Sequence, residues 1–487
     1  MELTVLVFLP AVAAALIMLL PQRYEQNAKW IALLGSVLTL ALSIWLFFNF
    51  DLHQSGFQYE VRRSWVDVGA FHLQYFMGVD GLSLPLVVLT TFLTLASVLV
   101  SFSVTMRPRA YYACLMVLAT SVLGVFCSLD FMLFFAFWEL ELFPMFLLIS
   151  VWGSGRKEYA ATKFVLFTFT GSAFMLVAIL ALAFSQHTFD IVQLGQSHFG
   201  ATIIPLSWIF FFLLLGFAVK LPVVPLHTWL PDAHSDAPTA VSVMLAGVLL
   251  KMGGYGIIRM CITIMPGVAN HYSIWFVGFG AVSILYGAFV TFRQTDLKRL
   301  IAYTSVSHMG IVLLGIGALG KTGLMGAEYQ MLAHGVIAGM LFVMVGLLYE
   351  RTHTREIAKL GGLARQMPLI ATGLVFAGFA SLGLPALAGF IAEITVFLGT
   401  FQRYEWAVLM GFFGSVLSAG YILWMLQRVV FGPVRNEWDS ITDASHWWEH
   451  SVVAGLAGLV ILLGVYPALM MDMIGPAVNT IMTRVGS

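Results

Sequence analysis

The sequence predicts an all-α integral membrane protein of about fourteen transmembrane helices. Of the 487 residues, 60% are hydrophobic and 10% are charged, and the mean hydropathy is +0.93. A soluble domain carries about 25% charged residues, so the solvent of this chain is lipid. Apolar runs recur along the whole chain. A few ionisable residues lie inside these runs and need a partner, water or a function.

A helix crosses the hydrocarbon core of a bilayer in about 20 residues. By that measure, the spans lie near residues 3–20, 29–50, 80–104, 110–127, 128–152, 159–185, 204–226, 238–264, 272–292, 298–319, 327–349, 367–402, 405–430 and 451–474. Basic residues follow the first run instead of preceding it, which indicates a membrane helix and not a signal peptide. The twelfth run is too long for one straight helix and contains GLPALAG, which predicts a break.

Basic residues orient the spans, because Lys and Arg are enriched in cytoplasmic loops. The loops after even-numbered spans hold only Arg62, Arg63, Lys321 and Arg403. The loops after odd-numbered spans hold Arg23, Lys29, Arg107, Arg109, Arg156, Lys157, Arg293, Lys298, Arg299, Arg351, Arg355, Lys359, Arg365, Arg428 and Arg435. This asymmetry predicts that both termini lie on the non-cytoplasmic side.

The polar stretches predict no further domain. The longest, 51–79, 186–203, 350–366 and 432–450, are each too short to bury a core. The net charge is zero, which argues against nucleic acid as a partner, and the three cysteines are far apart and form no CxxC pair. GGYGIIR lacks the strand–turn–helix setting of a nucleotide fingerprint. We therefore expect no metal, redox or cofactor site in this chain.

Spans seven and twelve share a physical pattern. Each joins an apolar half-helix to a Pro/Gly-rich break, GFAVKLPVVPLHTWLP in one and ASLGLPALAGFIAE in the other, with a charge beside it. Equivalent helices five spans apart cross in opposite directions, so the pattern indicates two inverted repeats around an ion path. The alternative is two unrelated proline kinks.

Four membrane-depth charges are the main candidates for that path: Glu139, Lys220, Lys251 and Glu393. Burial destabilises the ammonium group of Lys220, and a nearby carboxylate restores its charge, so the lysine can bind or release a proton as its partner moves. The alternative is a static, helix-packing salt bridge. Glu141 lies about 200° around the helix from Glu139, so both cannot face one partner.

A second group of residues could relay protons or be purely structural. His227, His308 and His334 titrate near neutral pH, although a buried histidine is more often a satisfied hydrogen-bonding residue. Lys163 is one turn inside its span, and snorkelling explains it as well as function does. His227 and His234 make no convincing metal site. We interpret Arg259 as an interfacial anchor.

Several segments of the sequence resemble a known family. These segments are FWELELFPMFLLISVWG, FAVKLPVVPLHTWLPDAHSDAPTAVSVMLAGVLLKMGGYGIIR, LKRLIAYTSVSHMGIVLLG, QMLAHGVIAGMLFVMVGLLYERTHTREI and GLPALAGFIAE. They look like the antiporter-like proton-channel subunits of respiratory complex I (NDH-1), over nearly the whole chain. The chain is most similar to the M-type, or chain 4, because Glu393 stands where the L and N types carry lysine.

The resemblance implies inverted five-helix repeats over 110–264 (spans four to eight) and 272–430 (spans nine to thirteen). It implies a midplane proton path from Glu139 with Lys220, through Lys251, to Glu393, with histidines and water between them. NADH or ferredoxin, flavin, Fe–S clusters and quinone would belong to partner subunits, and the L-type and N-type subunits would be neighbours. The membrane would be a bacterial inner membrane or a thylakoid.

Two other functions remain open at this stage. A subunit of a multisubunit sodium/proton antiporter shares this ancestry and needs no redox partner. A structural scaffold would use the buried charges only as packing salt bridges.

Overall fold

The computed structural model is a bundle of long helices, and it describes residues 1–486 except 55, 69–70, 198, 201 and 439–440. Twelve helices in this described part are long and apolar enough to cross a membrane, and three more are apolar but shorter. The predicted class, an α-helical membrane protein, is confirmed. The count of fourteen spans and the repeat boundaries stay predictions.

The first half of the chain forms the following elements: α1 Glu2–Leu19, α2 Ala28–Phe48, β1 Gln58–Val68, β2 Phe71–Val79, α3 Ser83–Val100, α4 Pro108–Cys127, α5 Phe131–Leu140, α6 Leu142–Trp152, α7 Lys157–Gln186, α8 Ile191–Gln196, α9 Leu206–Lys220, α10 Trp229–Asp236, α11 Thr239–Met244, η3 Leu245–Leu249, α12 Leu250–Gly256 and η4 Ile257–Ile262.

The second half forms α13 Pro266–Thr291, α14 Leu297–Gly317, α15 Lys321–Thr352, α16 Leu363–Gln366, α17 Pro368–Ser381, α18 Ala388–Phe401, α19 Glu405–Val429, α20 Trp447–Val465 and α21 Ala468–Val485. Short 3₁₀ turns join some of them: η1 Gln22–Asn27, η2 Ser101–Ser103, η5 Ile357–Lys359 and η6 Asn436–Trp438.

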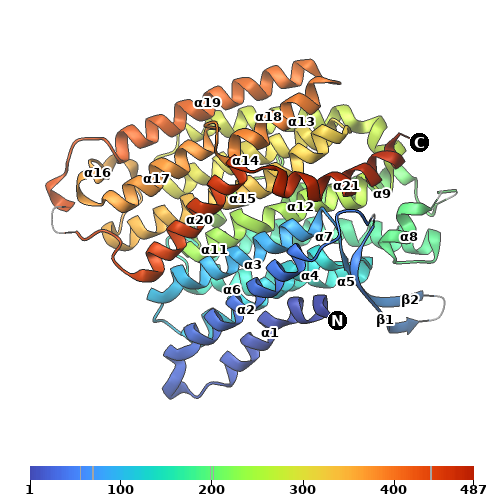
Figure 1. Cartoon of the computed structure of the whole chain (residues 1–487), viewed down its shortest axis with the longest axis horizontal. Helices are drawn as coiled ribbons and strands as arrows, with labels where there is room; N and C mark the ends of the chain where they lie inside the picture. Colours follow the sequence, from blue (N-terminus) through green and yellow to red (C-terminus); the bar gives the residue numbers. More distant parts are fainter. Residues whose placement is uncertain (55, 69–70, 198, 201, 439–440, 487) are drawn as a thin grey trace.

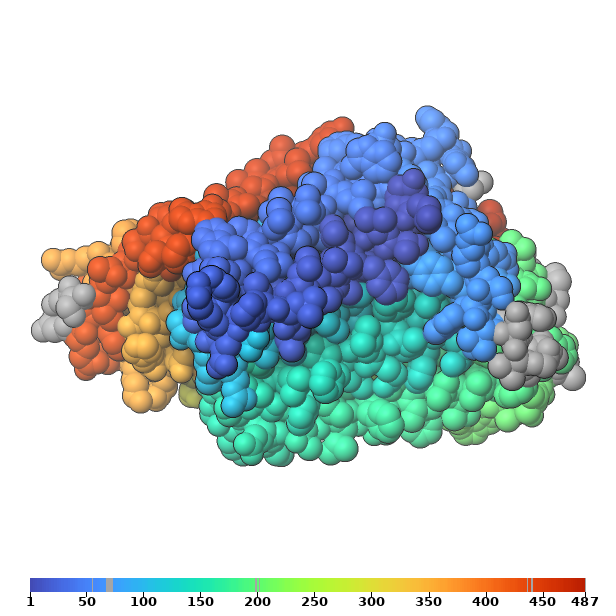
Figure 2. Space-filling view, turned by 90° about the horizontal axis from the view of Figure 1, so that it is seen from below, coloured from blue at the N-terminus to red at the C-terminus, as the bar shows by residue number. Residues whose placement is uncertain are grey.

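The two ends of the bundle differ (Figure 1). Both termini, the β1–β2 hairpin and α8 lie at one end, which we call the hairpin face. The other end holds α16, in the polar stretch 350–366 with its several basic residues, and we call it the basic face. In Figure 2, α1 and α2 lie on the outside of the bundle. The apolar stretches of α1, α2, α19 and α20 are each 39% buried inside the protein, whereas those of α15 and residues 239–262 are fully buried. These last two helices form the centre of the bundle.

Both predicted helix breaks are present. The chain leaves α9 at Lys220, makes a turn that contains Pro222 and Pro225, and resumes as α10. It leaves α17 at Ser381, passes Gly383 at φ +80°, and resumes as α18. Prolines lack the N–H that continues a helix, and glycine accepts the left-handed conformation at no steric cost. Each break therefore follows from its sequence and leaves a charged residue beside it.

The span expected over 128–152 is one apolar helix, Phe131–Trp152, with helical backbone angles at Glu141. A division in its hydrogen bonding at Glu141 separates α5 from α6. Pro144 explains the division, because it has no N–H to donate to the carbonyl of Leu140 and its ring clashes with that carbonyl. At the start of α5, the Asp130 carboxylate caps the helix by accepting from the N–H groups of Met132 and Leu133.

The helix that carries Lys251 is irregular. Two π-helical segments, η3 and η4, flank the α-helical turns of α12. Single π-turns inside helices are uncommon and concentrate at functional sites. The wider turns change the face that each following residue presents, so the simple helical spacing used on the sequence does not hold across this span.

Two elements differ from the predicted spans. The polar stretch 51–79 contains the antiparallel hairpin β1–β2, with Arg62 opposite Phe76 and Arg63 opposite Tyr75. After α20, the chain forms a further helix, α21, whose polar and apolar residues separate onto different faces more clearly than in the other helices. Neither element changes the fold class, since both flank the bundle.

Candidate functional site

Lys220 forms a buried ion pair with Glu141. The side chains are 1% and 0% exposed, and the lysine Nζ lies 5.4 Å from the ring centroids of both Trp138 and Phe164. Removing either partner would leave an uncompensated charge in an apolar, aromatic surrounding, which is strongly unfavourable. The pair joins the residue between α5 and α6 to the broken end of α9.

This pairing differs from the expectation that Lys220 pairs with Glu139. Glu139 is half-buried, lies against Ser172 of α7, and acts on Lys220 only as a nearby charge. Helical spacing explains the difference, because carboxylates about 200° apart point to different sides, Glu141 toward α9 and Glu139 toward α7. One lysine therefore has two carboxylates within electrostatic reach. The sequence reasoning undervalued Glu141.

Lys251 contacts a histidine from the other half of the chain. Its Nζ lies 2.8 Å from Nδ1 of His334 and also donates to the carbonyl of Ala246, in the π-helical segment η3. Both side chains are buried. Close packing makes the contact possible, since the Cβ that Gly335 lacks would lie 2.7 Å from the carbonyl oxygen of Gly247. Lysine and imidazole at this distance can share one proton between them.

Polar contacts continue from His334 toward α18. The rings of His334 and His308 have centroids 5.5 Å apart, and Nδ1 of His308 lies 3.6 Å from Oε1 of Glu393. The Ser415 hydroxyl donates to the other Glu393 oxygen at 2.8 Å. A cavity of about 10 Å³ lies between these residues and Gln330, which is about the space of one water molecule. The structure thus brings together Lys251, His334, His308 and Glu393, which we call the central chain.

The first half connects to the central chain by packing. A Cβ added at Gly253 would lie 2.6 Å from the backbone nitrogen of Leu221. Leu221 follows Lys220, and Gly253 is two residues from Lys251. The two lysines therefore sit on helices in direct backbone contact, although they share no hydrogen bond among the described residues.

His234 is a buried histidine that the sequence reasoning considered only as a metal ligand. Its ring is fully buried, stacks on Phe342 with centroids 4.5 Å apart, and has no hydrogen-bond partner for either nitrogen within the described residues. The charges of Lys298 and Lys251 act on it. The sequence feature that could have pointed to His234 is its place in HTWLPDAH, close to the helix break after Lys220.

His227 lies apart from the central chain, in the turn between α9 and α10. Its ring is buried, with the Tyr286 ring 5.0 Å and the Tyr303 ring 6.3 Å away between centroids. The charge that acts on it most is that of Lys163. Of the three histidines singled out in the sequence, His308 and His334 therefore join the central chain and His227 does not.

Lys163 takes part in an ion-pair network near the basic face. Its Nζ lies 2.7 Å from Oδ2 of Asp232, whose other oxygen lies 3.5 Å from Arg299. Asp232 belongs to α10 and Arg299 to α14, so the network ties the two halves together. Lys163 is 20% exposed and is held by a partner, which argues against free snorkelling.

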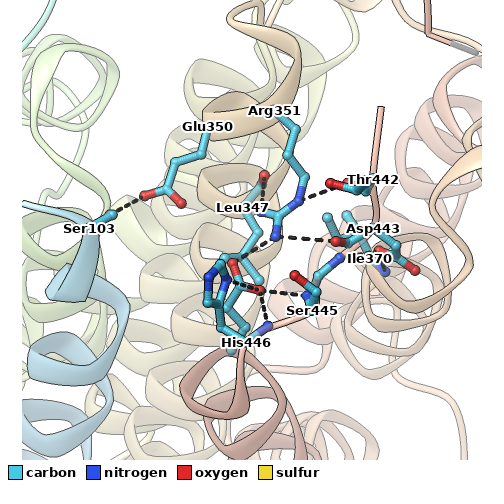
Figure 3. Close-up of polar contacts among 11 residues, drawn as sticks. Ser103, Leu347, Glu350, Arg351, Ile370, Thr442, Asp443, Ser445 and His446 are labelled. Carbon is cyan, nitrogen blue, oxygen red and sulfur yellow. Dashed lines mark hydrogen bonds and ion pairs between the residues drawn. The ribbon is translucent and has the colours of Figure 1, made fainter. Parts of the chain in front are cut away.

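A second polar network closes the basic face beyond α15 (Figure 3). Arg351 binds Glu449 at 2.7 Å and donates to the carbonyls of Thr442 and Asp443. Glu350 points the other way and accepts from Ser103 at 2.9 Å. These contacts fix the end of α15 to α20 and to the turn η2 that follows α3. They lie more than 15 residues along the helix from His334 and are not part of the central chain.

This arrangement has known counterparts. Residues 128–418, which are more than half of the chain, match the family of NADH:quinone oxidoreductase/Mrp antiporter transmembrane subunits. The chain belongs to this family. It is 43% identical to NADH-quinone oxidoreductase subunit M of Rhodobacter capsulatus, over 98% of this chain and 95% of that one. It is 39% identical to NAD(P)H-quinone oxidoreductase chain 4 of Gloeobacter violaceus, over 99% and 93%.

Solved structures agree with this assignment. A chain of respiratory complex I from Thermus thermophilus superimposes with a TM-score of 0.90 at 29% identity, over the whole of both chains. A chain of the Mrp complex from Dietzia sp. gives 0.85 at 18% identity, over 100% and 99%, which shows a shared fold alone. The predicted membership among M-type (chain 4) antiporter-like subunits is confirmed.

Proposed function

We propose that this chain is the proton-translocating membrane-arm subunit of a quinone-reducing NADH or ferredoxin dehydrogenase complex. The observation that carries the proposal is the central chain, in which buried proton-binding side chains follow one another from α12 through α15 and α14 to α18. Buried ionisable groups are costly in a membrane protein, and they are retained where ions or protons pass. The relatives named subunit M and chain 4 are subunits of quinone oxidoreductases, which supports a redox complex as the assembly that contains this chain.

The mechanism follows from the Lys220–Glu141 ion pair and from the contacts of the central chain. When Lys220 is paired with Glu141, its ammonium form is stabilised. When the pair opens, the lone ammonium is destabilised and passes a proton on, while Glu139 offers a second carboxylate. A charge change at Lys220 alters the preferred proton position between Lys251 and His334. The proton then moves over His308 to Glu393.

Redox chemistry would supply the energy from other subunits. NADH or ferredoxin, flavin, Fe–S clusters and quinone belong there in this proposal, and this chain contributes no redox site. The L-type and N-type antiporter-like subunits would be its neighbours. Both termini, and so the hairpin face, would lie on the non-cytoplasmic side of a bacterial inner membrane or thylakoid. Each repeat, 110–264 and 272–430, would contribute one broken helix.

The test uses the assembled complex in sealed vesicles. Lys220→Ala or Glu139→Gln should lower the number of protons transported per electron while subunit composition stays unchanged. His227→Gln serves as a control, because that ring lies outside the central chain. Normal transport in an assembled Lys220→Ala complex would refute the mechanism.

The subunit composition of the purified complex distinguishes this function from that of a sodium/proton antiporter. The family model covers both classes, but the curated relatives that match over nearly the whole chain are quinone oxidoreductase subunits. Purification of the native complex should recover Fe–S subunits with this chain. A complex without them that exchanges sodium for protons would favour the antiporter.

A further inference from the structure

Glu328 is a buried acid that the central chain does not use. It lies on α15, its side chain is fully buried, and neither carboxylate oxygen has a hydrogen-bond partner among the described residues. A buried polar group without a partner costs free energy and is rare in native proteins. Glu328 therefore needs a reason to be there.

Its position is one to two helical turns from the central chain. Six residues separate Glu328 from His334 on α15, which is about 9 Å along the axis. Glu328, Met331 and Gly335 share one face of that helix by the helical period. Met331 packs at Gly254 and Gly335 packs at Gly247, so this face lies against the Lys251 helix. Glu328 is on the side of His334 that leads toward the hairpin face.

A buried ion pair lies beyond Glu328 in the same direction. Arg259 of η4 binds Asp80 at 2.5 Å, and the two side chains are 6% and 9% exposed. These are the two charges that act on Glu328 most. The expectation that Arg259 is an interfacial anchor is therefore wrong, because the residue is an interior partner of Asp80.

A cavity connects this ion pair to the surface. It has a volume of about 60 Å³ and is lined by Asp80 and Arg259 and by Gln54 and Thr480. The last two residues are exposed, whereas the first two are buried. The rest of its lining is mostly apolar, so water in this cavity would lie beside the ion pair, and the volume is enough for several molecules. Glu328 thus lies between His334 and an ion pair that lines a cavity at the hairpin face.

We propose that Glu328 carries protons between the central chain and the Asp80–Arg259 cavity, and so forms the proton path to the hairpin face. The inference rests on the proposed function. Water carries a proton from His334 to the Glu328 carboxylate. The side chain then becomes the neutral carboxylic acid. The acid then releases the proton to water in the cavity. The negative charge of Asp80 acts on the remaining carboxylate more strongly than the positive charge of Arg259, so the carboxylate takes up the next proton.

A structural role makes a different prediction. A carboxylic acid that stays neutral and only fills space is nearly isosteric with glutamine, so Glu328→Gln would leave transport unchanged. A proton carrier cannot be replaced by glutamine, since an amide does not exchange a proton with its neighbours at useful rates. The shorter acid in Glu328→Asp keeps the chemistry but not the position.

The experiment follows protons on both sides of vesicles that contain the assembled complex, with pH indicators inside and outside. In Glu328→Gln we expect proton uptake from the basic face in the first turnover, and release at the hairpin face slowed by about tenfold or more. Lys220→Ala should lose uptake and release together. Glu350→Gln, at the other end of the same helix, where the Ser103 hydroxyl donates to the carboxylate (Figure 3), is the control and should behave as wild type.

The outcomes separate the two proposals. Wild-type release in Glu328→Gln, with transport lost in Lys220→Ala, overturns the role of Glu328 and keeps the proposed function. Normal transport in Lys220→Ala overturns the proposed function itself. If Glu328→Gln does not assemble, Glu328→Asp decides: slowed release with normal uptake supports a carrier, and unchanged timing of both refutes it.

Discussion

The strongest prediction concerns which glutamate holds Lys220 at rest. Changing Glu141 to Gln removes the carboxylate that the structure places against Lys220. Both side chains are essentially unexposed, so solvent screening does not weaken the effect. Breaking a buried pair from one side costs about 3–5 kcal/mol, whereas replacing both partners with apolar groups of similar volume is often neutral. Glu141→Gln and Lys220→Met should each destabilise the complex, and the double variant should recover most of the loss.

The assay is a double-mutant cycle on thermal inactivation. The inactivation rate of the detergent-solubilised complex is compared at one temperature for wild type, both single variants and the double variant. A loss of about 3 kcal/mol in the barrier corresponds to a rate increase of roughly a hundredfold. The coupling energy should amount to several kcal/mol, well above the ~0.5 kcal/mol scatter of independent sites.

A parallel cycle with Glu139→Gln provides the comparison. Glu139 is half-buried and lies against Ser172, so its coupling to Lys220 in stability should be small, although its loss should still lower proton transport. Near-additive effects for Glu141 together with strong coupling for Glu139 would refute the reasoning, because they would make Glu139 the resting partner.

Three further predictions follow from single contacts. Gly253→Ala would place a methyl group against backbone atoms of α9 and should cost about 1–3 kcal/mol, seen as a lower thermal midpoint, whereas Gly278→Ala, whose Cβ would meet nothing within 4 Å, should not. Ser415→Ala removes a hydrogen bond to Glu393 that is worth about 1.5–3 kcal/mol, so proton transport per electron should fall while electron transfer in uncoupled membranes continues; equal transport would contradict this. Pro144→Ala supplies the N–H that the turn between α5 and α6 lacks, and because the backbone at Glu141 is already helical, the coupling energy in the Glu141 cycle should change by no more than about 0.5 kcal/mol.

The sequence predicted the features that depend on local chemistry. The breaks beside Lys220 and Glu393 follow from proline and glycine, whose backbone limits do not depend on the rest of the fold. The position of Lys251 deep in a span was also correct, and it is fully buried. These predictions needed only the hydropathy and the identity of a few residues.

The features that depend on packing could not be predicted. Helical spacing shows that Glu139 and Glu141 face different ways, but which one meets α9 depends on how their helix is rotated against α7 and α9. Glu328 fell at the edge of the apolar run near 327–349, where a charge is ordinary. Helix α15 begins earlier, at Lys321, which moves Glu328 inside. The hairpin at 58–79 was missed because its alternation is short and was weighed only as a polar loop.

The contact of α9 with the Lys251 helix links the Lys220 ion pair to the central chain. The ion pair at Lys220 lies at the end of a broken helix, and backbone atoms of Phe217 and Leu221 at this end lie against Gly253 with no side chain between. A shift of the α9 end when the pair opens must therefore move α12. Two residues away on α12, Lys251 holds a 2.8 Å contact to His334, and a displacement of about 1 Å is enough to break such a hydrogen bond. Opening one pair and breaking the next contact are then steps of one motion, which is why a methyl group at Gly253 should disturb transport as well as stability.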